Sequence, residues 1–137
     1  PMVTGVQTCA LPIYRLSAIV SALIEADLLI LLSDIDGLYS DDPKKNPNAA
    51  FISQVDELSD ELMSMGKSTT GSDVGIGGMS TKLRAARIAT DSGADMVIAN
   101  GDHVEIIWDI LSGSETGTLF TAHKNQDFVL LDYMKTI

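Results

Sequence analysis

Residues 28–34 read Leu28-Leu29-Ile30-Leu31-Leu32-Ser33-Asp34, a run of five apolar residues that ends in two polar ones. A continuous apolar run of this length is typical of a strand buried on both faces of a parallel sheet. A similar pattern returns at Met96-Val97-Ile98-Ala99, which Asn100-Gly101 follows. We therefore expect two buried strands, each with a loop at its carboxyl end, where α/β sheets bind ligands.

Each of these predicted strands follows a predicted helix. Between residues 15 and 27, apolar residues recur at helical spacing and would form one inward face: Leu16, Ile19, Val20, Leu23 and Ile24. Residues 79–91 predict another helix, with Met79, Leu83, Ala86 and Ala89 or Thr90 inward, Lys82, Arg84 and Arg87 pointing elsewhere, and Gly93 as the C-terminal cap. Helices that alternate with buried strands indicate an α/β fold with right-handed crossovers.

The remaining segments predict smaller elements. We expect helices at 56–65 and 104–111, strands at 50–52 and 118–120, and an edge strand at 128–131. Residues 33–47 are rich in Asp, Gly, Pro and Asn and predict an irregular surface loop. Trp108 lies beside Ile107 and Leu111 and is expected to pack in the core, whereas His103 and His123 are expected at the surface or as caps.

The composition limits the classes of partner. The chain has 137 residues, 45% of them hydrophobic, and a formal net charge of −10. Nucleic acids and anionic membrane surfaces are bound by basic faces, so neither is an expected partner. No apolar run reaches the roughly 18 residues of a membrane span. A single cysteine, Cys9, excludes an internal disulfide, and a cytoplasmic protein is expected.

The run Gly75-Ile76-Gly77-Gly78-Met79-Ser80-Thr81-Lys82 leads directly into the predicted helix at 79. Glycines let the backbone approach a ligand, amides at a helix start attract an anion, and a lysine adds a full positive charge. The spacing differs from both the P-loop and the dinucleotide fingerprint. From the spacing alone, a flexible surface connection remains the simpler interpretation, and a phosphate site is the alternative.

Two stretches together resemble one known family. They are Leu31-Leu32-Ser33-Asp34-Ile35-Asp36-Gly37-Leu38-Tyr39-Ser40-Asp41-Asp42-Pro43 and Gly77-Gly78-Met79-Ser80-Thr81-Lys82. The first is shared across the amino acid kinase superfamily, and the second, with Thr81 before the lysine, is similar to the form in glutamate 5-kinases. Gly117-Thr118-Leu119-Phe120 supports the same family. Residues 15–133 resemble the C-terminal, ATP-binding half of a glutamate 5-kinase.

The resemblance implies a fold, a reaction and a set of site residues. It implies a three-layer α/β fold with a mostly parallel sheet between helices, of which residues 14–137 form the C-terminal half. It implies transfer of the ATP γ-phosphate, with Mg²⁺, to the side-chain carboxylate of L-glutamate, the first step of proline biosynthesis. Ser33 and Asp34 match nucleotide contacts, and the phosphate loop comprises Ile76, Gly77, Gly78, Met79, Ser80, Thr81 and Lys82. Lys82 would be the catalytic residue, and no side chain is expected to ligate a metal.

Three departures from the family accompany this resemblance. Ile76 stands where the family usually has threonine, and Leu11-Pro12-Ile13-Tyr14 stands in place of a Gly-Asp-Asn-Asp element that helps to bind glutamate and orient the catalytic lysines. The N-terminal half, with most of the glutamate pocket, has no counterpart. We therefore expect the chain alone to be inactive. A non-catalytic nucleotide-binding module and a kinase with another acceptor remain open alternatives.

Residues 1–13 differ in pattern from the rest of the chain. Val3 to Ile13 has neither helical nor strand periodicity and resembles a translated sequencing-adapter sequence. We interpret residues 1–13 as a non-native segment. A half sheet would expose an apolar strand edge, so a homo-oligomer is expected.

Overall fold

The computed structural model describes residues 13–68 and 78–135. Its elements in chain order are α2 (Ile13–Leu23), β1 (Leu28–Ser33), β2 (Leu38–Tyr39), β3 (Phe51–Ile52), β4 (Gln54–Val55), α3 (Asp60–Ser68), α4 (Met79–Ser92), β5 (Asp95–Asn100), α5 (Ile106–Leu111), β6 (Thr118–Phe120) and α6 (Leu130–Met134). The predicted strands at 28–32, 50–52, 96–99 and 118–120 are confirmed as β1, β3, β5 and β6. The helix expected at 79–91 is confirmed as α4.

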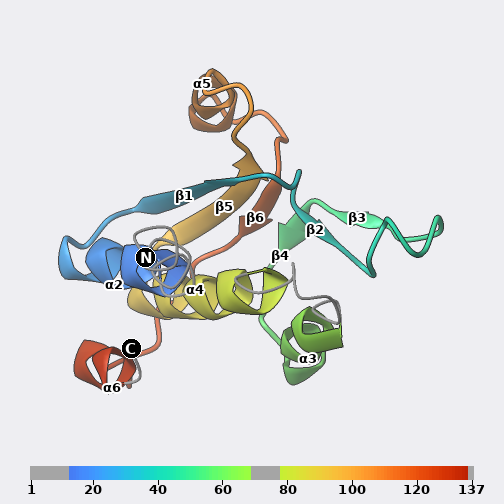
Figure 1. Cartoon of the computed structure of the whole chain (residues 1–137). Helices are drawn as coiled ribbons and strands as arrows, with labels where there is room; N and C mark the ends of the chain where they lie inside the picture. Colours follow the sequence, from blue (N-terminus) through green and yellow to red (C-terminus); the bar gives the residue numbers. More distant parts are fainter. Residues whose placement is uncertain (1–12, 69–77, 136–137) are drawn as a thin grey trace, which may run out of the picture.

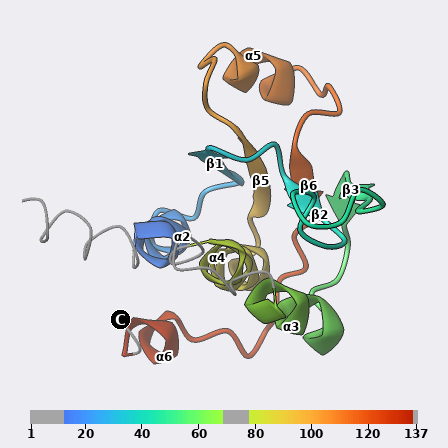
Figure 2. The same ribbon diagram turned by 45° about the vertical axis from the view of Figure 1, so that its right-hand side comes forward.

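A four-stranded sheet in the order β1-β5-β6-β4 organises the molecule. β1 pairs with β5 in parallel, β5 pairs with β6 antiparallel, and β6 pairs with β4 in parallel. α2 and α4 lie side by side on one side of the strands, whereas α5 lies on the opposite side (Figures 1 and 2). The expected α/β fold, with a mostly parallel sheet between helices, is confirmed.

Both helices that lead into the parallel strands end in the same left-handed turn. At the end of α4, Gly93 has φ 105°, and the Ala94 amide donates to the Ala89 carbonyl at 2.9 Å. At the end of α2, Glu25 takes this position with φ 54°, and the Ala26 amide donates to the Ser21 carbonyl at 2.9 Å. This turn ends α2 at Leu23, earlier than the expected 27. Glu25 therefore carries its side chain in the left-handed backbone region, which favours glycine.

The core forms where α2 and α4 pack on β1, β5 and β6. Leu83, Ala86, Ala89 and Thr90 of α4 are buried as predicted, together with Met96 and Ile98 of β5 and Phe120 of β6. Two predictions about burial were wrong. Lys82 was expected to point away from the apolar face, yet it is buried. Of the five apolar residues assigned to the inward face of α2, only Ile19 is buried.

β1 differs from the fully buried strand that the sequence predicts. Only Leu31 of its six residues is buried, whereas β5 buries its four central residues. The cause is position, because β1 is the edge of the described sheet and β5 lies between two neighbours. An apolar strand is therefore left half-covered.

Two further elements begin elsewhere than predicted. α3 begins at Asp60 and not at Asp56, because the Ser59 hydroxyl accepts a hydrogen bond from the Leu62 amide and caps the helix. Residues 128–131 do not form an edge strand. They enter helix α6, which brings Tyr133 to Phe128, with ring centroids 5.2 Å apart, and its hydroxyl to Asp91.

The expectation that Trp108 packs in the core was also wrong. Its side chain is 75% exposed, and the side chains of Val104, just before α5, and of Leu111, its last residue, are 62% and 60% exposed. α5 turns its half-buried residues Ile106, Ile107 and Ile110 toward the molecule instead. No described helix is long and apolar enough to cross a membrane.

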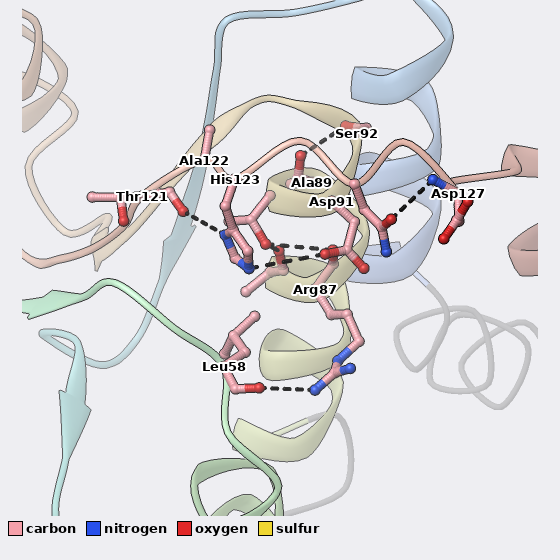
Figure 3. A network of polar contacts seen from close by, with 12 residues as sticks. Leu58, Arg87, Ala89, Asp91, Ser92, Thr121, Ala122, His123 and Asp127 are labelled. Atoms are coloured by element: carbon pink, nitrogen blue, oxygen red, sulfur yellow. Dashed lines mark hydrogen bonds and ion pairs between the residues drawn. The ribbon is translucent and has the colours of Figure 1, made fainter.

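Polar contacts on α4 fasten two distant segments to the helix (Figure 3). Arg87 donates to the Leu58 carbonyl at 3.0 Å and so holds the start of α3. Asp91 lies 4.0 Å from His123 Nε2, accepts from the Tyr133 hydroxyl, and its backbone carbonyl accepts from the Asn125 amide at 2.9 Å. His123 is exposed, as predicted. These contacts position the C-terminal segment against α4.

The two left-handed turns give a matched pair of stability predictions. Glu25→Gly should raise the free energy of unfolding by about 0.5–1 kcal/mol, because relief of Cβ strain exceeds the added entropy of the unfolded chain. Gly93→Ala should lower it by about 1 kcal/mol, because a Cβ at Gly93 would meet only the Lys124 side chain, at an ordinary contact distance of 3.5 Å, and the backbone strain dominates. Urea unfolding measures both. If Glu25→Gly lowered the free energy of unfolding as Gly93→Ala does, the assignment of backbone strain to Glu25 would be contradicted.

Candidate functional site

The carboxyl ends of β1 and β5 lie side by side, as the sequence predicts for neighbouring parallel strands. In the ladder, Ser33 is opposite Asn100. The Gly101 amide donates to the Ser33 carbonyl at 2.8 Å, and the Asn100 side chain donates to the Asp36 carboxylate at 3.1 Å. The loops that follow the two strands are therefore joined at one edge of the sheet.

Ser33 and Asp34 form the turn that leaves β1. Ser33 Oγ accepts from the Ile35 amide at 3.1 Å and lies 3.4 Å from Asp34 Oδ1. This side-chain bond to the backbone two residues on is a short turn that ends the strand. It leaves the Asp34 carboxylate exposed at the sheet edge.

Thr118 anchors the loop that follows this turn. It is fully buried, and its hydroxyl accepts from the Leu38 amide at 2.8 Å and donates to the Ile52 carbonyl at 2.6 Å. Gly37 packs against the same hydroxyl, since a Cβ there would lie 2.5 Å from Thr118 Oγ1. The two motifs at 36–39 and 117–120, far apart in the sequence, thus meet in the structure.

The start of α4 contains the described part of the predicted phosphate loop, residues 78–82. Gly78 is the N-cap and supplies no side-chain hydrogen bond to the first turn. Thr81 Oγ1 donates to the Gly78 carbonyl at 2.7 Å. Met79 and Ser80 are half-buried in the same turn. Ile76 and Gly77 lie outside the described residues, as does the 1–12 part of the segment interpreted as non-native.

Lys82 is the charged group of this turn, and it is only 3% exposed. Its Nζ lies 5.3 Å from the ring centroid of Tyr14, within cation–π range. Burial lowers the pKa of Lys82, while the Asp34 carboxylate acts in the opposite direction. Burial also raises the pKa of the Tyr14 hydroxyl, and Asp34 raises it further.

The structure thus brings together a buried cation, a carboxylate and an aromatic ring near the start of α4. A helix N-terminus without a side-chain cap, next to a buried ammonium, has the chemistry of an anion site. Sequence reasoning placed Asp34 and Lys82 in one site but missed Tyr14 as their neighbour. Within the described residues, no group of three or more His, Cys, Asp and Glu side chains is arranged to hold a metal ion.

A family model described as "Amino acid kinase family" matches residues 14–100. Among curated proteins, the chain is 49% identical over 112 residues to the glutamate 5-kinase of Clostridium perfringens, covering 82% of this chain and 41% of that protein. It is 54% identical over 105 residues to the glutamate 5-kinase of Clostridium acetobutylicum, covering 77% and 39%. The chain thus spans about two fifths of the length of these relatives.

Solved structures give a similar partial match. An isopentenyl phosphate kinase from T. acidophilum is 28% identical with a TM-score of 0.55, covering 78% of this chain and 38% of that one. A uridylate kinase from Archaeoglobus fulgidus is 22% identical with a TM-score of 0.54, covering 76% and 44%, which supports the fold alone.

The Thr118 anchor gives a prediction for the loop beside the site. Thr118→Val should lower the free energy of unfolding by about 2 kcal/mol, because the Leu38 amide and the Ile52 carbonyl lose their buried partner. Thr118→Ser keeps the hydroxyl and should cost about 1 kcal/mol for the lost methyl group. Chemical denaturation compares the two variants. If serine and valine cost the same, the hydroxyl is not the anchor.

Proposed function

Because the chain belongs to the amino acid kinase family, we propose that it forms the ATP-binding part of a glutamate 5-kinase. The complete enzyme would transfer the γ-phosphoryl group of ATP to the side-chain carboxylate of L-glutamate. The observation that carries this proposal is the buried Lys82 in the first turn of α4, beside Asp34 at the carboxyl edge of β1. The curated relatives named glutamate 5-kinase support the choice of acceptor.

The nucleotide would lie across the carboxyl edge of β1 and β5. Ser33 and Asp34 would contact it from the strand side. Its phosphates would lie at the start of α4, held by backbone amides of the segment Ile76, Gly77, Gly78, Met79, Ser80, Thr81 and Lys82. The first turn fits a phosphate group, since within the described residues Gly78 provides no side-chain cap for the amides there. Mg²⁺ would accompany the phosphates and neutralise part of their charge.

Lys82 would neutralise negative charge on the phosphoryl group during transfer. Such transfers depend on positioning and electrostatics more than on covalent participation by the protein. A lysine in a water-poor position interacts more strongly with charge than an exposed one. Burying the ammonium group costs free energy, and the attraction of the Asp34 carboxylate offsets part of that cost.

The activity of the complete enzyme extends beyond this chain. The chain spans about two fifths of the curated relatives, so the glutamate pocket would come mostly from elsewhere. We propose that the chain alone binds nucleotide without catalysing transfer. The complete kinase would act in proline biosynthesis in the cytoplasm, as a homo-oligomer. Among the described residues, twelve large hydrophobic side chains are exposed, which supports association of the isolated chain.

A non-catalytic nucleotide-binding module is the second candidate, and Tyr14 favours it. Tyr14 stands where the resemblance implies an acidic residue that orients the catalytic lysines, and its ring lies over the Lys82 ammonium. A neutral ring holds a cation more weakly than a carboxylate and offers no proton acceptor of matching strength. In this case the chain would bind ATP with no transfer even when a complementary half is supplied.

Lys82→Met tests the nucleotide site. The variant should weaken ATP binding at least about tenfold, because a charge-assisted contact to phosphate is lost. Its free energy of unfolding should stay equal or rise, because a buried charge is removed. Isothermal titration with MgATP and urea unfolding measure the two effects. Lys135→Met, at the exposed lysine that follows α6, is the matched control and should change neither. Unchanged ATP affinity in Lys82→Met would contradict the proposal.

The isolated chain should not catalyse phosphoryl transfer. Incubated with ATP, Mg²⁺ and L-glutamate, it should release no ADP above a protein-free control, because most of the acceptor pocket is missing. The assay couples ADP formation to an optical signal. Transfer at a normal kinase rate of about 1–100 s⁻¹ would overturn the claim that the chain is inactive alone.

A further inference from the structure

The Asn100 side chain links the two loops that follow β1 and β5. Its Nδ2 donates to the Asp36 carboxylate at 3.1 Å, and its Oδ1 accepts from the Asp102 backbone amide at 2.9 Å. A carboxamide carries a donor and an acceptor at the same end, so this one side chain holds a residue of each loop. An ionised carboxylate at this position would accept from the Asp102 amide, but it could not donate to Asp36.

The backbone at Asn100 is fixed by the sheet. Asn100 lies opposite Ser33 in the parallel ladder, and the Gly101 amide donates to the Ser33 carbonyl at 2.8 Å. Gly101 also packs closely on β1, since a Cβ there would lie 2.9 Å from Leu32 Cβ. The Asn100 side chain therefore starts from a position set by the ladder, and it ties Asp36 to the sheet.

Asp34 lies in the segment that this side chain restrains. Its carboxylate is exposed, but the residues around it are held, Ser33 by the ladder and Asp36 by Asn100. The same carboxylate opposes the lowering of the Lys82 pKa that burial causes. A Coulombic interaction weakens with distance and with screening by solvent, so a less restrained Asp34 would stabilise the Lys82 ammonium less.

The neutrality of Asn100 also matters at this edge of the sheet. Asp36 and Asp102 are both exposed acidic residues, in a chain with a net charge of −10. A third carboxylate between them would repel Asp36 and would add to the negative charge that an anionic ligand meets. The carboxamide joins the two loops without that charge.

We propose that Asn100 is a positioning residue of the nucleotide site, which restrains the loop after β1 and so keeps Asp34 in place near Lys82. Asn100 acts through Asp36 and touches no reacting atom. This inference rests on the proposed ATP site and adds to it a residue outside both sequence motifs.

An exchange of donor and acceptor tests this role. Asn100→Asp should weaken the binding of MgATP at least about threefold, because repulsion replaces the hydrogen bond to Asp36. The double variant Asn100→Asp/Asp36→Asn restores the bond with its direction reversed, and its affinity should return to within about twofold of the unmodified chain. Isothermal titration measures the affinities, and urea unfolding verifies that each variant is folded.

A second double variant, Asn100→Asp/Asp102→Asn, is the matched control. It has the same net charge as the first double variant and keeps the backbone amide at position 102, but it leaves two carboxylates facing each other at positions 100 and 36. Its affinity should stay as low as that of Asn100→Asp. If the control recovered affinity as fully as the first double variant, charge alone would explain the effect, and the positioning role would be refuted.

Hydrogen exchange without nucleotide measures the restraint on the loop itself. The Ile35 amide, which donates to Ser33 Oγ, should exchange at least about threefold faster in Asn100→Asp and near its original rate in Asn100→Asp/Asp36→Asn. Equal exchange in all variants would overturn the proposal while MgATP still binds the unmodified chain. An unmodified chain that binds no MgATP would overturn the proposed function, and the role of Asn100 in it, so the two failures are distinguishable.

Discussion

The parallel ladder between β1 and β5 is the constraint from which the candidate site follows. Its register aligns Ser33 with Asn100, so the loops after both strands leave the sheet at the same edge. Parallel pairing also requires a crossover, and α4 supplies it on the side where α2 already packs. Tyr14 of α2 and Lys82 of α4 meet because of this packing. A shift of one residue in the ladder would separate these groups.

The spacing of apolar residues correctly predicted the elements that pack directly against the core. α4, β5 and β6 were all predicted from their apolar pattern, and Gly93 was predicted as the cap of α4. The wrong predictions concern apolar residues whose structure depends on which other elements pack beside them. Residues 128–131 are apolar enough for a strand, but they pair with no strand of the described sheets, and contacts of Tyr133 with Phe128 and Asp91 favour a helix. Trp108 fits a core position by spacing alone, yet α5 turns it to solvent.

The sequence predicts which residues could form the candidate site, but it does not predict how deeply they are buried. Local sequence identifies a glycine-rich segment before a lysine and a polar turn after a strand. Tyr14 and Lys82 lie 68 positions apart in the sequence, and local sequence carries no information on a contact over that separation, so it could not be predicted. Helical spacing also predicts that a lysine on α4 lies on the solvent-exposed face. Lys82 is nevertheless buried, and removing its ammonium from water costs stability.

The hairpin between β2 and β3 is fastened at its base and independent at its tip. Thr118 holds the base through Leu38 and Ile52, while the tip is closed by bonds of its own, such as those from the Lys45 and Asn46 amides to the Asp42 carbonyl. Below the tip, the Ser40 amide donates to the Ala50 carbonyl and the Ala50 amide donates to the Ser40 hydroxyl. A conformational change at the tip is therefore confined to the residues beyond this pair. Residues 41–49 are thus the part of the chain where length is free to vary, and where an inserted peptide or reporter would leave the sheet edge undisturbed.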